Sequence, residues 1–96
     1  MREVLKRPRA YSDLEEIWLF TFEQWGEEQA NRYVRRLNEE IINLAEEPER
    51  GRSLQTIRAG YFSVHVGRHL VLYTFTETTV SVRRVLHDQM DTGRHL

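Results

Sequence analysis

The chain has 96 residues, a length that suits one small domain covering 1–96. It contains no cysteine, which excludes a disulfide framework and a thiolate metal site. No apolar run is long enough to cross a bilayer, and the first residues lack the core of a signal peptide. We therefore expect a cytoplasmic protein that does not associate with membranes.

The formal net charge of −1 hides an uneven distribution. Residues 1–10 carry four Lys or Arg and one acid, and residues 11–49 carry eleven acids and three Arg. Residues 50–96 carry seven Arg, three acids and all four His. The middle of the chain is therefore acidic and the last half is basic. A basic region of this kind can bind an anion or can be an ordinary solvated surface.

The predicted elements begin with a short strand at residues 3–7, which Pro8 would end. Ser12 and Glu15 have the spacing of a capping box, so we expect Ser12 to be the N-cap of a first helix. Gly26 predicts the end of this helix. Its apolar face comprises Leu14, Ile17, Trp18, Phe22 and Trp25. We expect both tryptophans on this face to be core residues.

A second helix is predicted to open with Glu27 and Glu28, whose carboxylates favour the positive end of the helix dipole. Pro48 and Gly51 mark its end. Because the loop between the two helices is very short, they should form an antiparallel hairpin. The apolar stripe of the second helix comprises Ala30, Tyr33, Val34, Leu37, Ile41, Leu44 and Ala45.

From about residue 57 onward the apolar pattern changes from helical spacing to alternation. This predicts three strands at 61–66, 70–75 and 80–87, with turns at Gly67-Arg68 and Glu77-Thr78. Consecutive strands joined by tight turns form an antiparallel meander. The sequence therefore predicts an α+β domain of order β-α-α-β-β-β, with the helical hairpin packed on one face of a small antiparallel sheet.

The register of the meander decides which strand residues meet the helices. With plain hairpins, the helix-facing side is strongly apolar and comprises Val64, Val66, Leu70, Leu72, Val80 and Val82. The opposite side is mixed and comprises His65, His69, Val71, Tyr73, Phe75, Arg83, Val85 and His87. Arg84 then falls among the apolar residues, a conflict that a bulge or an edge position would resolve. A slip of one residue would exchange the two faces.

The apolar residues of the mixed side need a cover, because monomers rarely leave such a patch bare. One hypothesis is a groove for a partner peptide or helix. The others are a second packing layer, formed by the C-terminal tail or the first strand, and a contact between two copies of the chain. For a partner, we expect a contact face that comprises Arg58, Tyr61, His65, His69, Tyr73, Arg83, Val85 and His87.

One set of residues on this side resembles the groups that a ribonuclease needs. His69 and His87 could transfer protons while Arg83 holds the phosphate. The same histidines can equally be half-buried structural residues. His65 and His69 lack a third ligand at suitable spacing, and the chain has no Gly-rich phosphate loop. We therefore predict no metal and no cofactor.

Several short segments have a specific order and spacing over nearly the whole chain. They are Asp13-Leu14-Glu15-Glu16-Ile17-Trp18, Trp25-Gly26 with Ala30 and Tyr33, Leu44-Ala45 with Pro48, Gly51-Arg52, Arg58-Ala59-Gly60-Tyr61, His69-Leu70-Val71-Leu72-Tyr73, and Arg84-Val85-Leu86-His87 with Met90-Asp91. Together they resemble the ParE-type toxins of the RelE/ParE family. The resemblance implies a RelE-like fold and the toxin of a type II toxin–antitoxin system. It also implies a hetero-oligomer with a neutralising ParD-like antitoxin, and non-enzymatic inhibition of DNA gyrase without direct binding to nucleic acid.

RelE-type toxins instead cleave mRNA in the ribosomal A site, with a cluster of Lys, Arg and a C-terminal Tyr, or of Glu, Arg and His. This chain departs from that pattern. It has no Lys after Lys6 and no Tyr after Tyr73, and His69 stands where RelE-type toxins have a strand arginine. The resemblance therefore favours gyrase inhibition. The alternatives are a ribosome-dependent endoribonuclease that uses His69, Arg83 and His87, and a relative that only binds its antitoxin.

Overall fold

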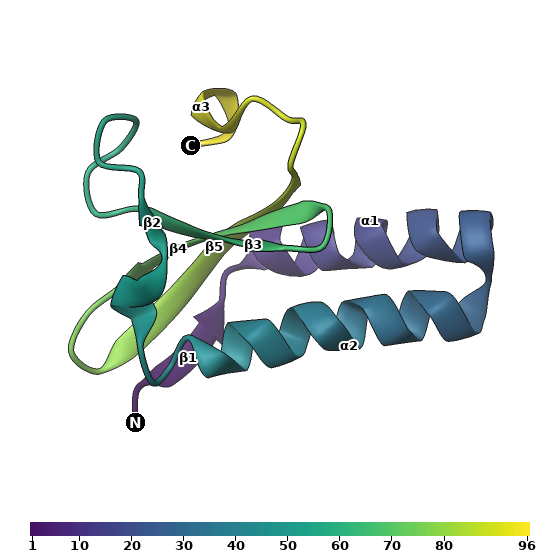
Figure 1. The fold of residues 1–96 in the computed structure, drawn as a ribbon, viewed down its shortest axis with the longest axis horizontal. Helices are drawn as coiled ribbons and strands as arrows, with labels where there is room; N and C mark the ends of the chain where they lie inside the picture. Colours follow the sequence, from purple (N-terminus) through teal and green to yellow (C-terminus); the bar gives the residue numbers. More distant parts are fainter.

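A computed structural model describes residues 1–96 as a five-stranded sheet with a helical hairpin on one face (Figure 1). The sheet has the order β1-β5-β4-β3-β2. The strands are β1 (Glu3–Lys6), β2 (Arg52–Ser53), β3 (Phe62–Val66), β4 (His69–Phe75) and β5 (Thr79–His87). The helices are α1 (Pro8–Trp25), α2 (Glu27–Asn43), a 3-10 turn at Pro48–Arg50 and α3 (Thr92–His95). The α+β class and the order of the main elements are confirmed, and no helix has the length and apolarity to cross a membrane.

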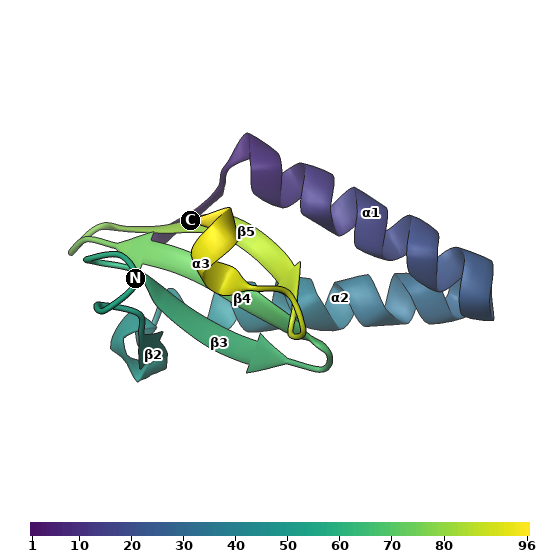
Figure 2. The ribbon, with the colours of Figure 1, turned by 90° about the horizontal axis from the view of Figure 1, so that it is seen from above.

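The sheet is mixed, because β1 runs parallel to β5 while all other neighbouring strands are antiparallel. A parallel pair needs a long connection, which the hairpin and the meander supply here. The two-residue strand β2, which the sequence did not predict, adds an edge next to β3. The helical hairpin covers one face of this sheet and extends beyond the ends of its strands (Figures 1 and 2).

Helix α1 begins one turn earlier than predicted. Pro8 occupies its first turn and Arg7 is the N-cap, so Ser12 lies inside the helix and the predicted capping box is wrong. Proline favours this position because its fixed φ suits a helix and its missing N–H would have no partner there. Ala10, in the added turn, is completely buried. Tertiary packing therefore supports a turn that has no side-chain cap.

The main core lies between the hairpin and the sheet. Gly26 has a φ of +90° and ends α1 as predicted, so that α2 starts at the next residue. Leu37 and Ile41 of α2 are fully buried against Leu14 and Ile17 of α1 and against the sheet. Trp25, however, is 67% exposed, and Trp18 is only half-buried. The prediction that both are core residues is wrong, because the hairpin runs beyond the sheet that would cover them.

The predicted faces of β4 and of the end of β5 are exchanged, for two reasons. Val66 pairs with His69 rather than with Leu70, which shifts β4 by one residue. In β5, Arg83 is an extra residue between the pairs Leu72↔Arg84 and Tyr73↔Val82. This bulge turns the following residues to the other face. The core beneath the helices therefore contains Val71, Tyr73, Val80, Val82 and Val85, with Phe75 packed against it.

The other face of the sheet carries a second, smaller apolar cluster of Leu54, Leu72 and Leu86. Tyr61, Leu70 and Leu96 pack against it. Leu96 brings the C-terminal segment over this face, as the position of α3 in Figure 2 illustrates. Of the three predicted covers, a second packing layer that includes the tail is therefore observed, although it covers leucines and not the predicted aromatic residues.

Candidate functional site: a groove beneath the helical hairpin

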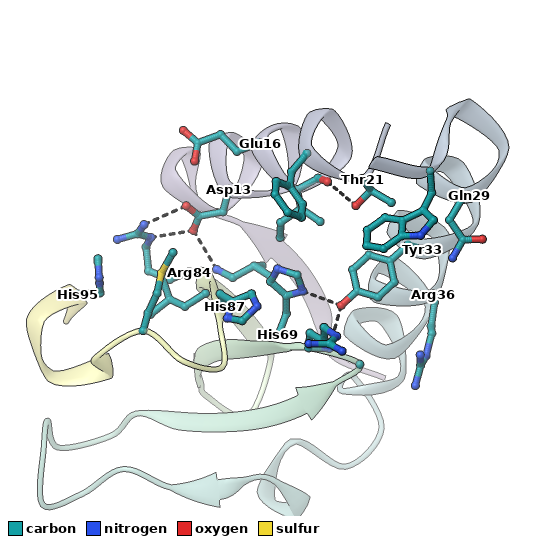
Figure 3. A pocket seen from close by; sticks show the side chains of 18 residues that line it. Asp13, Glu16, Thr21, Gln29, Tyr33, Arg36, His69, Arg84, His87 and His95 are labelled. Carbon is teal, nitrogen blue, oxygen red and sulfur yellow. Dashed lines mark hydrogen bonds and ion pairs between the residues drawn. The ribbon is translucent and has the colours of Figure 1, made fainter. Parts of the chain in front are cut away.

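A concave surface of about 990 Å³ lies where the hairpin overhangs the end of the sheet. Residues from α1, the start of α2, the β3–β4 turn, the end of β5 and the C-terminal segment line it (Figure 3). The apolar lining includes Ile17, Phe20, Trp25, Val85, Leu86 and Met90. The charged and polar lining includes Asp13, Glu16, Gln29, Tyr33, Arg36, Arg68, His69, Arg84, His87 and His95.

At one end of the groove, Asp13 and Arg84 form a nearly buried ion pair. Arg84 Nε and Nη2 donate to the two carboxylate oxygens of Asp13 at 2.7 and 2.9 Å. The backbone N–H of Val85 donates to the same carboxylate at 2.9 Å. The hydrogen bond to Asp13 raises the pKa of the Arg84 guanidinium, so that it stays charged. Arg84 Nη1 is buried and has no hydrogen-bond partner.

At the other end, Tyr33 links α2 to the β3–β4 turn. Its hydroxyl lies 2.6 Å from His69 Nδ1 and accepts a hydrogen bond from the backbone N–H of Arg68 at 3.1 Å. Burial, and then the nearby His87, lower the pKa of His69. His69 is therefore neutral near pH 7, and in the tautomer with its proton on Nε2 its Nδ1 can accept a hydrogen bond from the hydroxyl of Tyr33. The His69 side chain is therefore a structural part of the groove floor.

The sequence-predicted pair of histidines is brought together. His69 and His87 are direct partners across β4 and β5, and their ring centroids lie 5.5 Å apart in an edge-on arrangement. His87 Nδ1 lies 3.4 Å from Asp88 Oδ1, and His65 Nε2 lies 3.1 Å from Asp88 Oδ2. Asp88 thus lies near a histidine in the groove and one outside it, while His87 Nδ1 accepts a hydrogen bond from the backbone N–H of Gln89 at 3.2 Å. No group of His, Cys, Asp or Glu has the arrangement of a metal site.

The other predicted contact residues are dispersed, and of them only Val85 lines the groove with His69 and His87. Tyr73 and Val85 lie in the main core, with exposed fractions of 0% and 3%, so the prediction that they belong to an open face is wrong. Arg83 lies on the far side of the sheet, where its Nε donates to Thr74 Oγ1 at 3.3 Å. Arg58 stacks over the ring of Tyr61 at 5.0 Å, at the second apolar cluster.

Several groove residues were not predicted as site residues, chiefly Phe20, Trp25, Tyr33 and Asp13. Two signals in the sequence point to Phe20 and Trp25. An 18-residue helix is about 27 Å long, which exceeds the length of a strand of five residues and leaves the distal turns uncovered. In addition, Phe20 lies off the apolar face that contains Leu14 and Ile17, which is unusual for a ring in a solvated helix.

Comparison with known proteins identifies the family. Residues 4–92 match the family model described as the ParE toxin of the type II toxin-antitoxin system parDE. Toxin ParE1 of Mycobacterium tuberculosis is 43% identical over 93 residues, which cover 96% of this chain and 95% of that protein. Toxin ParE1 of Caulobacter vibrioides is 40% identical over 88 residues, which cover 92% and 91% of the two chains.

Solved structures agree on the fold. A chain from the chromosomal ParDE TA system of P. aeruginosa superposes with a TM-score of 0.78 at 16% identity, covering 91% of this chain and 96% of that one. A chain of the toxin-antitoxin complex RelBE2 from Mycobacterium tuberculosis gives 0.71 at 28% identity, covering 90% and 96%. The first match concerns the fold alone. Because the family model spans nearly the whole chain and two curated relatives exceed 30% identity, this protein belongs to the ParE toxin family of type II toxin–antitoxin systems.

Proposed function

We propose that this ParE-family toxin inhibits DNA gyrase by binding it, without catalysing a reaction, and that a ParD-like antitoxin neutralises it by occupying the groove. The observation that carries this proposal is the engagement of two polar groups in the groove. Arg84 is held by Asp13, and His69 is held by Tyr33. Gyrase acts in the cytoplasm, so the toxin would act there too.

A ribonuclease active site needs groups that are free to hold a phosphate and to move protons. Arg84, one of the three arginines that line the groove, donates two hydrogen bonds to a carboxylate. Arg83, the predicted phosphate ligand, lies on the opposite face of the sheet. These features support binding to a protein rather than cleavage of RNA.

The groove has the properties of a site for an amphipathic helix. Exposed rings, Phe20 at 62% and Trp25 at 67%, flank an apolar floor and offer anchor contacts. The unpartnered Nη1 of Arg84 could donate to a carbonyl or carboxylate of the bound segment, which would remove the cost of its burial. The ParDE and RelBE2 structures are named as toxin–antitoxin assemblies, and an antitoxin partner for this chain follows by analogy.

The test uses purified gyrase, relaxed plasmid, ATP and increasing toxin, with and without the ParD-like antitoxin. We expect loss of supercoiling or accumulation of cleaved plasmid, and recovery when the antitoxin is added in excess over the toxin. A folded toxin that arrests growth in cells but leaves supercoiling unchanged at saturating concentration would exclude gyrase as the target.

A ribosome-dependent endoribonuclease remains the second candidate, because His69 and His87 lie side by side in the groove. On that hypothesis, His87→Ala would abolish mRNA cleavage by translating ribosomes and growth arrest together, while the fold stays intact. Gyrase inhibition predicts that the variant stays toxic.

A further inference from the structure

The hairpin also carries an apolar surface that does not belong to the groove. It consists of Trp18, Leu19 and Phe22, which we call the outer patch. Leu19 is 53% exposed and Phe22 is 43% exposed. The rings of Trp18 and Phe22 stack with centroids 5.1 Å apart, and the indole of Trp18 donates to Asn31 of α2 at 2.8 Å. The stack is thus held in place before any partner arrives, which lowers the entropic cost of binding.

The outer patch and the groove lie on different sides of α1. Ile17 is buried and lines the groove, and Leu19 follows two residues later, a rotation of about 200° around the helix. None of the three patch residues lines the groove. Trp25, at the groove edge, is three residues from Phe22 and therefore its neighbour on the helix surface. A partner can therefore contact the outer patch without entering the groove. A bulky occupant of the groove, however, would lie close enough to the outer patch to obstruct that partner.

Acidic side chains flank the outer patch along α1. Residues 10–31 contain six acids and no Lys, Arg or His. Two of these acids are paired, Asp13 with Arg84 and Glu28 with Arg32. Glu15 and Glu23, four residues before and after Leu19, form no ion pair. They lie on the same stripe of the helix as Leu19, so the apolar centre has a carboxylate on each side.

This combination selects one kind of partner. Carboxylates around the patch repel nucleic acid and acidic peptides, and they attract a surface rich in Lys and Arg. A partly buried aromatic anchor within a charged rim is also the usual arrangement of a protein–protein hot spot. The complementary surface is therefore a basic protein surface with an apolar pocket.

We propose that the outer patch, with Glu15 and Glu23, is the surface by which the toxin binds its target, and that it docks on a basic surface of the target that otherwise holds DNA. This inference rests on the proposed inhibition of gyrase. An enzyme that acts on DNA must carry such surfaces, because contacts from Lys and Arg to phosphates supply most of the affinity for DNA. The toxin then competes with DNA for the same site, and an antitoxin in the groove obstructs this contact.

The test compares two variants in the patch with two matched controls. Leu19→Ser and Glu23→Lys change the patch and its rim. Ile42→Ser and Glu39→Lys make the same chemical changes on α2, at an Ile that is 61% exposed and at an exposed Glu without an ion pair. Thermal melting of all four confirms that the fold is retained. Binding to purified gyrase is measured in the absence of DNA, at low and high salt, and then with a competing DNA duplex; inhibition of supercoiling is measured in parallel.

We expect Leu19→Ser and Glu23→Lys to raise the half-inhibitory concentration by about tenfold or more, which corresponds to loss of one anchor contact, while both controls inhibit as the wild type does. We also expect that DNA displaces the toxin and that salt weakens binding. Unchanged inhibition by the patch variants, or equal loss in the controls, would overturn this inference and leave gyrase inhibition standing. A wild-type toxin that does not bind gyrase would instead overturn the proposed function, and with it this inference.

Discussion

Asp13 in the second turn of α1 accepts hydrogen bonds from the side chain of Arg84 and from the backbone N–H of Val85, 71 and 72 residues later. This contact joins the hairpin to β5 at the point where β1 no longer pairs with it, since β1 pairs only with residues 79–82 of β5. The carboxylate therefore replaces a missing strand neighbour. It also holds the arginine that the groove would otherwise expose.

The Asp13–Arg84 pair should be a major source of stability. Asp13→Asn leaves a nearly buried guanidinium without its counter-ion, and we expect a loss of about 3 kcal/mol in the free energy of unfolding. Urea denaturation measures this loss. Glu16→Gln, at an exposed carboxylate one turn away, is the matched control and should change stability by less than about 0.5 kcal/mol. Equal and small effects of the two substitutions would contradict a structural role for the pair.

The neutral state of His69 predicts how stability depends on pH. Its folded-state pKa lies below the ordinary histidine value of 6.5, so the unfolded chain binds more protons than the folded one as pH falls through 6.5. The contribution of His69 is therefore fully present above pH 6.5 and is lost on acidification below it. Denaturation curves at several pH values should show a smaller acid-induced loss for His69→Gln than for the wild type. Identical pH profiles would show that His69 is not responsible.

Alanine substitutions at two glycines with positive φ should separate the stability cost of backbone strain from that of a side-chain clash. Gly60 has a φ of +82° and open space where a Cβ would lie, whereas a Cβ at Gly67, with a φ of +59°, would lie 2.7 Å from the hydroxyl of Tyr33. Gly60→Ala should cost about 1 kcal/mol, from the left-handed conformation alone. Gly67→Ala should cost about 1 kcal/mol more, because it also displaces Tyr33 from the β3–β4 turn. Equal melting temperatures would argue against tight packing of Tyr33 on this turn.

The exposed rings of the groove should matter for the antitoxin and little for the fold. Phe20→Ser and Trp25→Ala remove side chains that are 62% and 67% exposed, so we expect stability within about 0.5 kcal/mol of the wild type. Binding of the ParD-like antitoxin should weaken by about tenfold or more, because each ring is an anchor. Isothermal titration measures the affinity, with Ile42→Ser as control. Unchanged affinity in both variants would place the antitoxin elsewhere.

Most of the secondary structure could be predicted from the sequence. Alternation and turn residues placed β3, β4 and β5 within one residue at each end, and Gly26 marked the boundary between the helices. These features depend on local chemistry. The start of α1 was misplaced because Ser12 and Glu15 form a good local cap, while the buried contacts of Ala10 extend the helix by a further turn. A tertiary contact of this kind leaves no local signal.

The candidate site was less predictable, because it depends on the register of the sheet. One slipped residue at the β3–β4 turn and one bulge at Arg83 decide whether Tyr73 and Val85 face the helices or the solvent. Neither is encoded by alternation, which is the same in both registers. The sequence pointed to His69 and His87 as possible neighbours at strand ends that the turns bring together, and the structure pairs them directly. The role of Phe20 and Trp25 depended on the overhang of the hairpin, for which the sequence offers only the length of the helix and the position of Phe20 off its apolar face.

The most direct measurement of the central claim is gyrase supercoiling in the presence of the toxin in which His69 and His87 are both replaced by glutamine. Glutamine keeps a polar side chain but cannot transfer protons at neutral pH. If the toxin acts by binding gyrase, the folded double variant should inhibit supercoiling at the same concentration as the wild type. The opposite result would contradict the account: the folded double variant no longer arrests growth, and the wild-type toxin leaves gyrase untouched but cleaves mRNA on ribosomes.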